Sequence, residues 1–406
     1  MMKERNKIGL GAAIIIGINA MIGAGVVAMP ATLSAAGPAG IISYVAAIAF
    51  AMLIGLSLAH LAELFPGSGW SYIYPEKWGG HKIGMFSAFC YLIGVLIAMG
   101  FIVQQTGIWL HDYFFSGLHY NVVAFGLDYN QIFSAIILFL LTILVLAGAE
   151  ASSFGQYVIA AFVLIPLGLT AIVAWLNIKL TIISNFMPHG IKPVLETTPK
   201  ALYTLMGFES IASLYTIVQN PKKNVAKACM IAIFSVGSVY IFFAAGILFS
   251  IPNSYFAKGL GESLANVIRY AFPSYPYLAL FVLVGGLFAM IGTLHSMLWS
   301  LASLSSDVLK KSRSRIIKLM LEKKIWNDNS AVILISTTML LSAIFIQAES
   351  ILLTTICFIV MSYLLSISLL LFQKKEWKTG KNIRTVFAML GGFAMLYYAI
   401  KGIFFI

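Results

Sequence analysis

The sequence has very few charged side chains. Only 10% of its 406 residues are Asp, Glu, Lys or Arg, against about 25% in water-soluble domains. In contrast, 60% of the residues are hydrophobic and the mean hydropathy is +0.94. So few charges cannot give a folded chain a polar surface in water. The sequence therefore predicts an integral membrane protein and excludes a water-soluble fold.

Cysteine is also scarce. The three cysteines, Cys90, Cys229 and Cys357, all lie inside apolar segments. An extracellular disulfide framework is thereby excluded, and neither a CxxC pair nor a Cys/His spacing suited to a metal is present. Buried free cysteines behave as small hydrophobic side chains. We therefore expect no metal or other cofactor.

Long apolar runs dominate what is present. Eleven runs are long enough for a tilted spanning helix, which needs about 20 residues. They cover about residues 8–35, 40–62, 84–110, 131–149, 155–176, 199–219, 226–250, 277–306, 330–348, 350–372 and 383–404. The first run follows the basic stretch MMKERNK as a signal peptide would, but it exceeds the 7–15 apolar residues typical of one. The sequence thus predicts an all-α membrane protein with about eleven spans.

The net charge of +12 is placed in the loops between these runs. A basic chain suggests a nucleic-acid partner, but positive loops are better explained by membrane orientation, since cytoplasmic loops are rich in Lys and Arg. With the N-terminus inside, 20 of the 26 Lys and Arg residues lie on the inner side. We therefore expect a multi-pass protein of the cell (inner or plasma) membrane with a cytoplasmic N-terminus. The basic inner loop 310–329 is predicted to be a plain connector, with a surface-lying helix as the alternative.

Two of the runs are interrupted near their middle. Gly23 and Gly25 interrupt the first run, and Gly207 interrupts the sixth, which reads ALYTLMGFESIASLYTIVQNP. The breaks are five segments apart, in segments that cross the membrane in opposite directions. This pattern predicts a 5+5 inverted repeat with discontinuous helices 1 and 6. The chain is then one transmembrane domain, 1–406, with repeats at about 8–176 and 199–372 and an extra helix at about 383–404.

Broken helices of this kind suit a zwitterionic ligand. Unwinding frees N–H and C=O groups, which a bilayer tolerates only where they line a cavity or are buried in protein. Glycine lets a ligand approach the main chain. Half-helix N-termini suit a carboxylate, and the opposite ends present carbonyl groups that suit an ammonium. The breaks therefore predict an amino acid site, although small residues can also serve close helix packing alone.

Three kinds of polar side chain in the apolar runs are candidates for function. Glu209 lies at mid-membrane, where an acid is functional by default. It is either a proton-carrying or gating group, or an acceptor for amides freed by the break at Gly207. His295 is predicted to be a packed histidine bonded to a neighbouring helix, with a cavity-facing role as the alternative. A set of hydroxyls is expected to bond to its own helix rather than to a sodium ion, namely Ser300, Ser303, Ser305 and Ser306.

Three stretches resemble the amino acid–polyamine–organocation (APC) family of permeases. They are IGAGVVAMP in segment 1, LAELFPGSGWSYIYPEKWGG after segment 2 and LMGFESIASLYTIVQNPKKNV through segment 6. The resemblance covers segments 1–8 and is greatest to the basic amino acid/polyamine antiporter branch, which FVLIPLGLTAIVAW in segment 5 supports. It implies a five-plus-five fold and alternating access, usually with twelve spans.

The resemblance also implies a binding site. The main chain of Ile22, Gly23, Ala24 and Gly25 would bind the substrate carboxylate, and carbonyl groups of Met21, Tyr203 and Met206, next to Gly207, would receive its ammonium. Tyr203 would be an aromatic lid and Glu209 the family's acid in segment 6. Ala98, Phe101 and Met297 would surround the substrate side chain.

Several positions depart from the family pattern. Ala24 stands where a hydroxyl is common, so the carboxylate would bind main-chain groups alone. Ala98 and Met297 replace the polar and aromatic groups that a guanidinium requires. The range 160–162 holds AAF where some proton-coupled relatives carry a lysine. These departures predict a neutral rather than a dibasic substrate, and exchange rather than proton-driven uptake.

The predicted function is a secondary active amino acid exchanger. The alternatives are a proton- or sodium-coupled symporter of amino acids or polyamines and, from other classes, a channel or a membrane enzyme. A channel needs a polar pore lining or oligomeric symmetry, and an enzyme needs clustered catalytic groups, which the sequence does not show. We expect a small amino acid or amine and the bilayer as partners, no nucleic acid, and a homodimer as one assembly.

Overall fold

The fold was analysed in a computed structural model of the chain. It describes residues 7–115, 117, 127–257, 263–313, 315–323, 326–345, 350–372 and 381–404. Some of the basic residues used for orientation lie outside these ranges, namely Lys3, Arg5, Lys258, Lys324, Lys374, Lys375 and Lys378.

Helices make up the fold, as the hydropathy predicts, because in a bilayer a helix satisfies its main-chain groups within one segment. The first half of the chain forms α1 (Leu10–Met21), α2 (Gly25–Ser34), η2 (Gly37–Ala39), α3 (Gly40–Leu64), α4 (Trp70–Phe114), α5 (Tyr129–Leu146), α6 (Ala149–Leu176) and α7 (Leu180–Ser184). The second half forms α8 (Ile191–Tyr203), α9 (Ser210–Ser213), η3 (Tyr215–Ile217), α10 (Pro221–Ser250), α11 (Asn253–Ala257), α12 (Leu264–Ala271), α13 (Leu278–Lys310), α14 (Arg315–Glu322), α15 (Asp328–Phe345), α16 (Ser350–Ile367), α17 (Leu369–Phe372) and α18 (Lys381–Phe404). Ile8 and Val218 form an isolated β-bridge.

The all-α membrane class is confirmed, whereas the count of eleven spans stays a prediction. By length and composition, eight helices of the described residues can cross a membrane, or nine when α1 and α2 are taken as one bent span. The sixth predicted segment does not qualify, because its break leaves helical pieces of only 13 and 4 residues. The described part of α15 is an apolar helix below the length required.

Both predicted helix breaks are present. Between α1 and α2 the chain leaves the helix at residues 22–24, and the two helices are bent by 46° relative to each other. Between α8 and α9 the residues 204–209 form turns, and Gly207 has φ +119°, a conformation that favours glycine. Discontinuous helices 1 and 6 are therefore confirmed as features of the fold.

Two predicted loops turned out to contain helices. The predicted loop 63–83 is helical from Trp70, and this helix continues into the span through a kink at Gly80, where φ is +77°. The predicted connector 310–329 contains α14. The loop 63–83 was wrongly predicted because a search for long apolar runs passes over helices that carry polar and charged side chains. In 310–329 the preferred plain connector was wrong, and the alternative of a helix is present over Arg315–Glu322.

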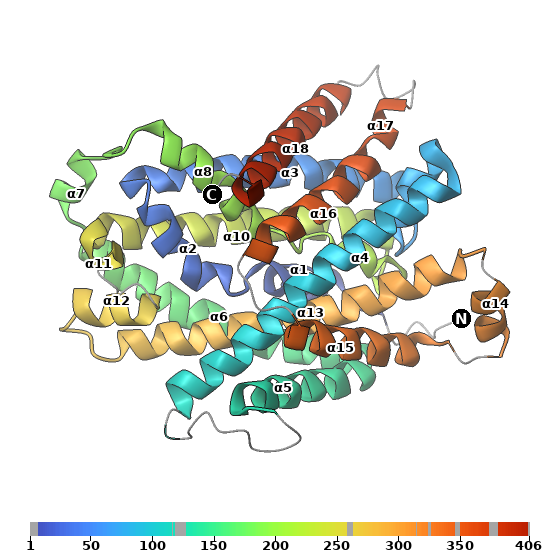
Figure 1. Ribbon diagram of the computed structural model, residues 1–406, viewed down its shortest axis with the longest axis horizontal. Coiled ribbons are helices and arrows are strands. Elements are labelled where there is room, and N and C mark those ends of the chain that lie inside the picture. The colour runs from blue at the N-terminus through green and yellow to red at the C-terminus, as the bar shows by residue number, and fades with distance from the viewer. Residues whose placement is uncertain are drawn as a thin grey trace.

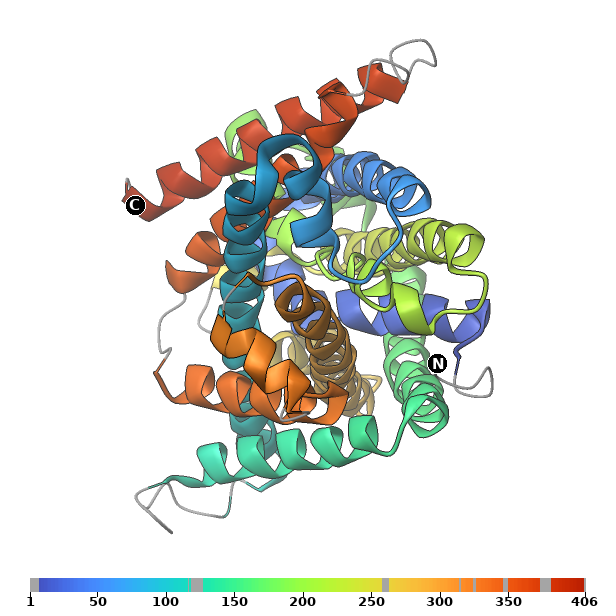
Figure 2. The same ribbon diagram turned by 90° about the vertical axis from the view of Figure 1, so that its right-hand side faces the viewer.

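The helices run between two ends of an elongated bundle (Figure 1). The short helices α7, α11 and α12 gather at one end, while α14 lies at the other. Helix α18 lies along the outside of the bundle, where it packs on α16 and α3 (Figure 2). Helix α1 contacts α10, α13, α6 and α9 and is largely buried. The first break is thereby held inside the bundle.

Candidate functional site

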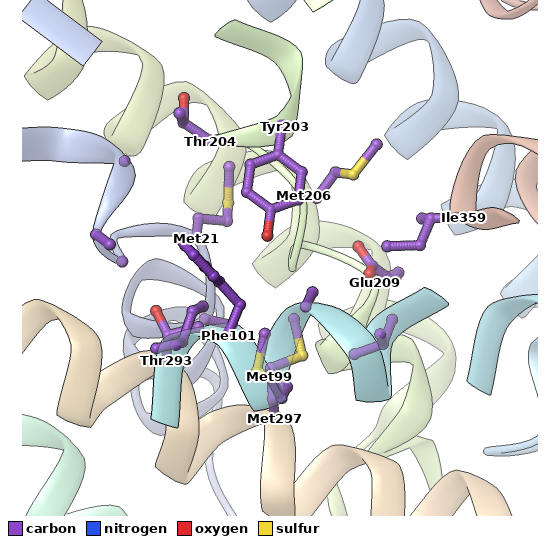
Figure 3. A pocket seen from close by; sticks show the side chains of 17 residues that line it. Met21, Met99, Phe101, Tyr203, Thr204, Met206, Glu209, Thr293, Met297 and Ile359 are labelled. Carbon is purple, nitrogen blue, oxygen red and sulfur yellow. The ribbon is translucent and has the colours of Figure 1, made fainter. Parts of the chain in front are cut away.

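A cavity lies where the two broken helices meet (Figure 3). It encloses about 560 Å³ of space not filled by atoms, part of it open to solvent. Its lining comes from the two breaks, from the middle of α4, and from α13 and α16: Ala20, Met21, Gly23, Ala24, Gly25, Val95, Ala98, Met99, Phe101, Ile102, Tyr203, Thr204, Met206, Glu209, Thr293, Met297 and Ile359. Figure 3 shows the Tyr203 ring extending from the end of α8 into the cavity.

The first break supplies free hydrogen-bond donors. Gly23 N–H donates to Met21 O at 3.0 Å, but the amides of Ala24 and Gly25 donate to no main-chain group among the described residues. These amides lie at the N-terminus of α2, where the helix dipole favours negative charge. A substrate carboxylate would satisfy both requirements.

The carbonyl groups at the breaks are less free than the predicted ammonium site requires. Met21 O accepts from Gly23 N–H and also from the Tyr240 hydroxyl at 2.9 Å. Tyr203 O accepts from Met206 N–H at 3.1 Å. Since a carbonyl oxygen accepts two hydrogen bonds, Met21 is already satisfied, whereas Tyr203 retains one free lone pair.

Tyr240 joins the two breaks. Its hydroxyl lies 2.9 Å from Met21 O in the first break and 3.3 Å from Thr204 O in the second. Its ring packs against Tyr44, with centroids 5.4 Å apart. Tyr240 thus connects the two unwound segments. It was not predicted as a site residue, because it lies on α10, far from both breaks in the sequence.

Glu209 is buried at one side of the cavity, with 1% of its surface exposed. Its Oε2 accepts from Gly207 N–H at 3.0 Å, and its Oε1 accepts from the Tyr91 hydroxyl at 2.9 Å. The first bond is the one predicted for an acceptor of amides freed by the break. Glu209 is also the only charged side chain among the described residues of the lining.

The part of the lining farther from the first break is apolar. It contains the side chains of four methionines, together with aliphatic groups on α4 and α16: Met21, Met99, Met206, Met297, Val95, Ala98, Ile102 and Ile359. Methionine is flexible and adapts to irregular shapes. Such a lining suits an uncharged side chain, since a buried cation requires a charge partner or dense hydrogen bonding.

Ten of the twelve residues proposed for the site line this cavity, including Glu209. The other two, Ile22 and Gly207, are not among the lining residues. Ile22 is fully buried in the core, and Gly207 packs on the main chain of Ala20, where an added Cβ would lie 2.5 Å from Ala20 O. Thr293 also lines the cavity but was not predicted, although it precedes Met297 by one helical turn and so lies on the same face of α13.

Aromatic side chains close the cavity on the side of Glu209. Trp70 is fully buried, its indole N–H donates to Ser213 Oγ at 3.1 Å, and its ring packs against Tyr91 and Tyr363. On the opposite side, the lining residues Ala24, Gly25, Phe101 and Tyr203 are partly exposed. The cavity is therefore closed toward the start of α4 and more open toward the other end of the bundle.

A group of hydrogen bonds around Asp307 joins three segments on the side of the cavity near the start of α4. Asp307 Oδ2 accepts from the amides of Ser68 and Gly69, at 2.9 and 3.1 Å, and Ser68 Oγ accepts from Thr216 N–H at 3.2 Å. We call this group of contacts the Asp307 clamp. It joins α13 and the end of the second broken helix to the loop before α4. Burial lowers the pKa of the adjacent Lys311 ammonium, and the Asp307 carboxylate opposes this shift.

The family model that describes amino acid permeases matches residues 8–406. The chain belongs to the amino acid permease family. An uncharacterized transporter of Mycobacterium bovis is 28% identical over 300 residues, which is 65% of this chain and 59% of that protein. A methylthioribose transporter of Bacillus subtilis is 24% identical over 266 residues, 63% of this chain and 57% of that protein.

A cationic amino acid transporter 4 of Mus musculus is 25% identical over 253 residues, 59% of this chain and 40% of that protein. The matched region thus spans about half the length of these relatives. Their names also differ in the substrate they specify, so the family assignment supports the predicted APC resemblance but leaves the choice of substrate to the residues of the cavity.

Proposed function

We propose that the protein is a secondary active transporter that exchanges neutral amino acids by alternating access. The observation that carries this proposal is the cavity at the two breaks, where unpaired amides of Ala24 and Gly25 face the same space as an apolar lining. The amides suit a carboxylate, and the lining suits an uncharged side chain. A channel or an enzyme requires neither arrangement.

In this proposal Tyr203 covers the substrate from the more open side, and Glu209, Tyr91 and Trp70 form the inner barrier. The free lone pair on Tyr203 O, together with the main chain at Met206, would receive the substrate ammonium. The two units at about 8–176 and 199–372 would act as inverted repeats that move relative to each other around the site. We further propose a cell-membrane location, a cytoplasmic N-terminus and a homodimeric assembly.

The substrate selectivity of transport tests whether the apolar lining favours an uncharged side chain. In proteoliposomes loaded with an unlabelled neutral amino acid, we expect leucine and alanine to compete with labelled substrate, and lysine, arginine and putrescine to compete at least tenfold less. This is because desolvating a cation without a charge partner costs more than a cation–π contact of about 2 kcal/mol with Tyr203 or Phe101 returns. Stronger competition by lysine or putrescine would show that Glu209 pairs with an amine, as the name of the cationic relative suggests.

Coupling is tested in the same vesicles. Residues 160–162, where some proton-coupled relatives carry a lysine, are AAF. Of the serines expected to bond to their own helix, Ser300 and Ser305 donate to carbonyl groups of α13 at 3.2 and 3.0 Å, whereas Ser306 Oγ is buried without a partner among the described residues. We therefore expect labelled substrate to enter only when exchangeable substrate is inside. Accumulation driven by a sodium gradient into vesicles without internal substrate would favour the symporter.

A further inference from the structure

A buried polar cluster lies next to the cavity but is not part of its lining. It consists of Asn19 on α1, Gln156 on α6, and His295 and Ser296 on α13, each with 1% or less of its surface exposed. The Asn19 side-chain amide donates to Gln156 O at 2.8 Å and to Gln156 Oε1. The Gln156 amide donates to Ser296 Oγ at 2.8 Å and contacts His295 Nδ1 at 2.8 Å. The prediction that His295 bonds to a neighbouring helix is confirmed.

The hydrogen bonds define the protonation of the imidazole. Gln156 Oε1 accepts from Asn19, so Gln156 Nε2 faces His295 and donates to Nδ1. The proton of a neutral imidazole then resides on Nε2. His295 Nε2 and Asn19 Oδ1 are both buried without a hydrogen-bond partner. Both atoms therefore keep a hydrogen-bonding capacity that a change of protonation in the cluster can use.

The cluster is linked to the substrate site through α1. Asn19 precedes the end of α1 at Met21 by two residues, and Asn19 O accepts from the Thr293 hydroxyl at 2.9 Å. Thr293 and Met21 both line the cavity. At Gly292, an added Cβ would lie 3.3 Å from Asn19 Cβ, so α1 and α13 approach closely here. A change in the cluster would therefore reach the first break directly.

The surroundings leave His295 as the titratable group of the cluster. Helix α1 carries no Asp, Glu, Lys, Arg or His. The titratable side chains of α6 are Glu150 at its start and Tyr157, whose side chain is exposed. On α13, Asp307 and Lys310 lie three or more turns away. Among the described residues no charged side chain acts on the imidazole, and its burial disfavours the charged form. Its remaining neighbour is the stacked ring of Trp299, with centroids 6.4 Å apart.

We propose that His295 is a proton-binding site that controls the movement of α1. A proton on Nδ1 removes the acceptor that Gln156 uses, so the Gln156 amide turns over and presents Oε1 to the imidazolium. Gln156 Nε2 then faces Asn19, whose amide turns in response and presents the previously unpaired Oδ1. The Ser296 hydroxyl, which accepted from Gln156 Nε2, turns to donate to Oε1, and the bond from Asn19 to Gln156 O is lost, so α1 is less firmly held to α6. The imidazolium is then held by Gln156 Oε1, and because it has no charge partner it forms only as the pH is lowered into the acid range.

This inference goes beyond the proposed exchange and rests on it only for the transport measurement. Proton binding itself is tested by fluorescence in nanodiscs between pH 4 and pH 8, because a protonated imidazole stacked on an indole quenches its emission. The emission of Trp299 is obtained by subtracting the fluorescence of Trp299→Phe from that of the unmodified protein. We expect this signal to fall as the pH is lowered, and the fall to vanish in His295→Gln. In counterflow, we expect the exchange rate to rise roughly fivefold over the same range, about the effect of losing one net hydrogen bond.

Two further variants make the test decisive. Gln156→Glu places a carboxylate beside the imidazole, so the midpoint of the fluorescence change should move to higher pH by about one unit or more. This holds even if His295→Gln fails to fold. His189→Gln, at an exposed histidine outside the cluster, should leave both profiles unchanged. A Trp299 signal that titrates equally in His295→Gln, or a midpoint unmoved by Gln156→Glu, overturns the proposal. Fluorescence titration without any amino acid exchange would instead refute the proposed function alone.

Discussion

Gly25→Ala is expected to abolish amino acid uptake while the protein still inserts and folds. A Cβ at this position would overlap Thr204 Cγ2 and lie 2.8 Å from Thr204 Cβ, so the two breaks would be forced apart. At Gly23 a Cβ would lie 2.9 Å from Thr293 Oγ1. Leucine at either position would in addition fill the space in front of the free amides. Such overpacking costs about 1–3 kcal/mol, which a bundle of this size tolerates.

The measurement is counterflow in proteoliposomes, with size-exclusion chromatography to confirm folding. The matched control is Gly168→Ala on α6, where an added Cβ meets no atom within 4 Å, and we expect normal uptake. Combining Gly25→Ala with Thr204→Ser removes one of the overlapping atoms and should restore part of the activity. Normal uptake by both Gly23→Leu and Gly25→Leu would refute the proposal that the substrate binds the main chain at this break.

Glu209→Ala is expected to lower transport by roughly 100-fold, because it leaves two buried donors without an acceptor at about 1–3 kcal/mol each. These donors are Gly207 N–H and the Tyr91 hydroxyl. Tyr91→Phe removes one donor together with its need for an acceptor, so we expect a loss of only about tenfold or less. Glu209→Gln keeps one acceptor oxygen and should lie between the two.

This order separates the two roles that the sequence left open for Glu209. If the residue acts as the acceptor that holds the second break, activity falls with the number of unpaired donors. If it carries a proton, Glu209→Gln will be as inactive as Glu209→Ala, and Tyr91→Phe will be close to normal. Thermal melting of the purified variants gives a second reading, since only the first role predicts that stability falls in the same order.

The sequence predicted the features of the site that depend on neighbouring residues. Glycines in an apolar run identify a helix break, and the φ of +119° at Gly207 is a conformation that glycine adopts at little cost. The sequence alone could not predict contacts between residues that the fold brings together from distant segments. Tyr240 contacts Met21 across 219 positions and Tyr91 contacts Glu209 across 118. Asn19 and Gln156 were detectable as polar residues in apolar runs, but their contact was not.

The Asp307 clamp has a consequence for how the chain tolerates mutation. Both hydrogen bonds to the Asp307 carboxylate come from main-chain amides, at Ser68 and Gly69. Any residue other than proline offers such a donor, so the side chains of the loop can change without removing these two bonds. The acceptor has no such freedom, because the carboxylate comes from a single position on α13. The two main-chain bonds of the clamp therefore depend on one side chain, that of Asp307, so we expect substitutions of Asp307 to loosen this side of the bundle more than substitutions in the loop.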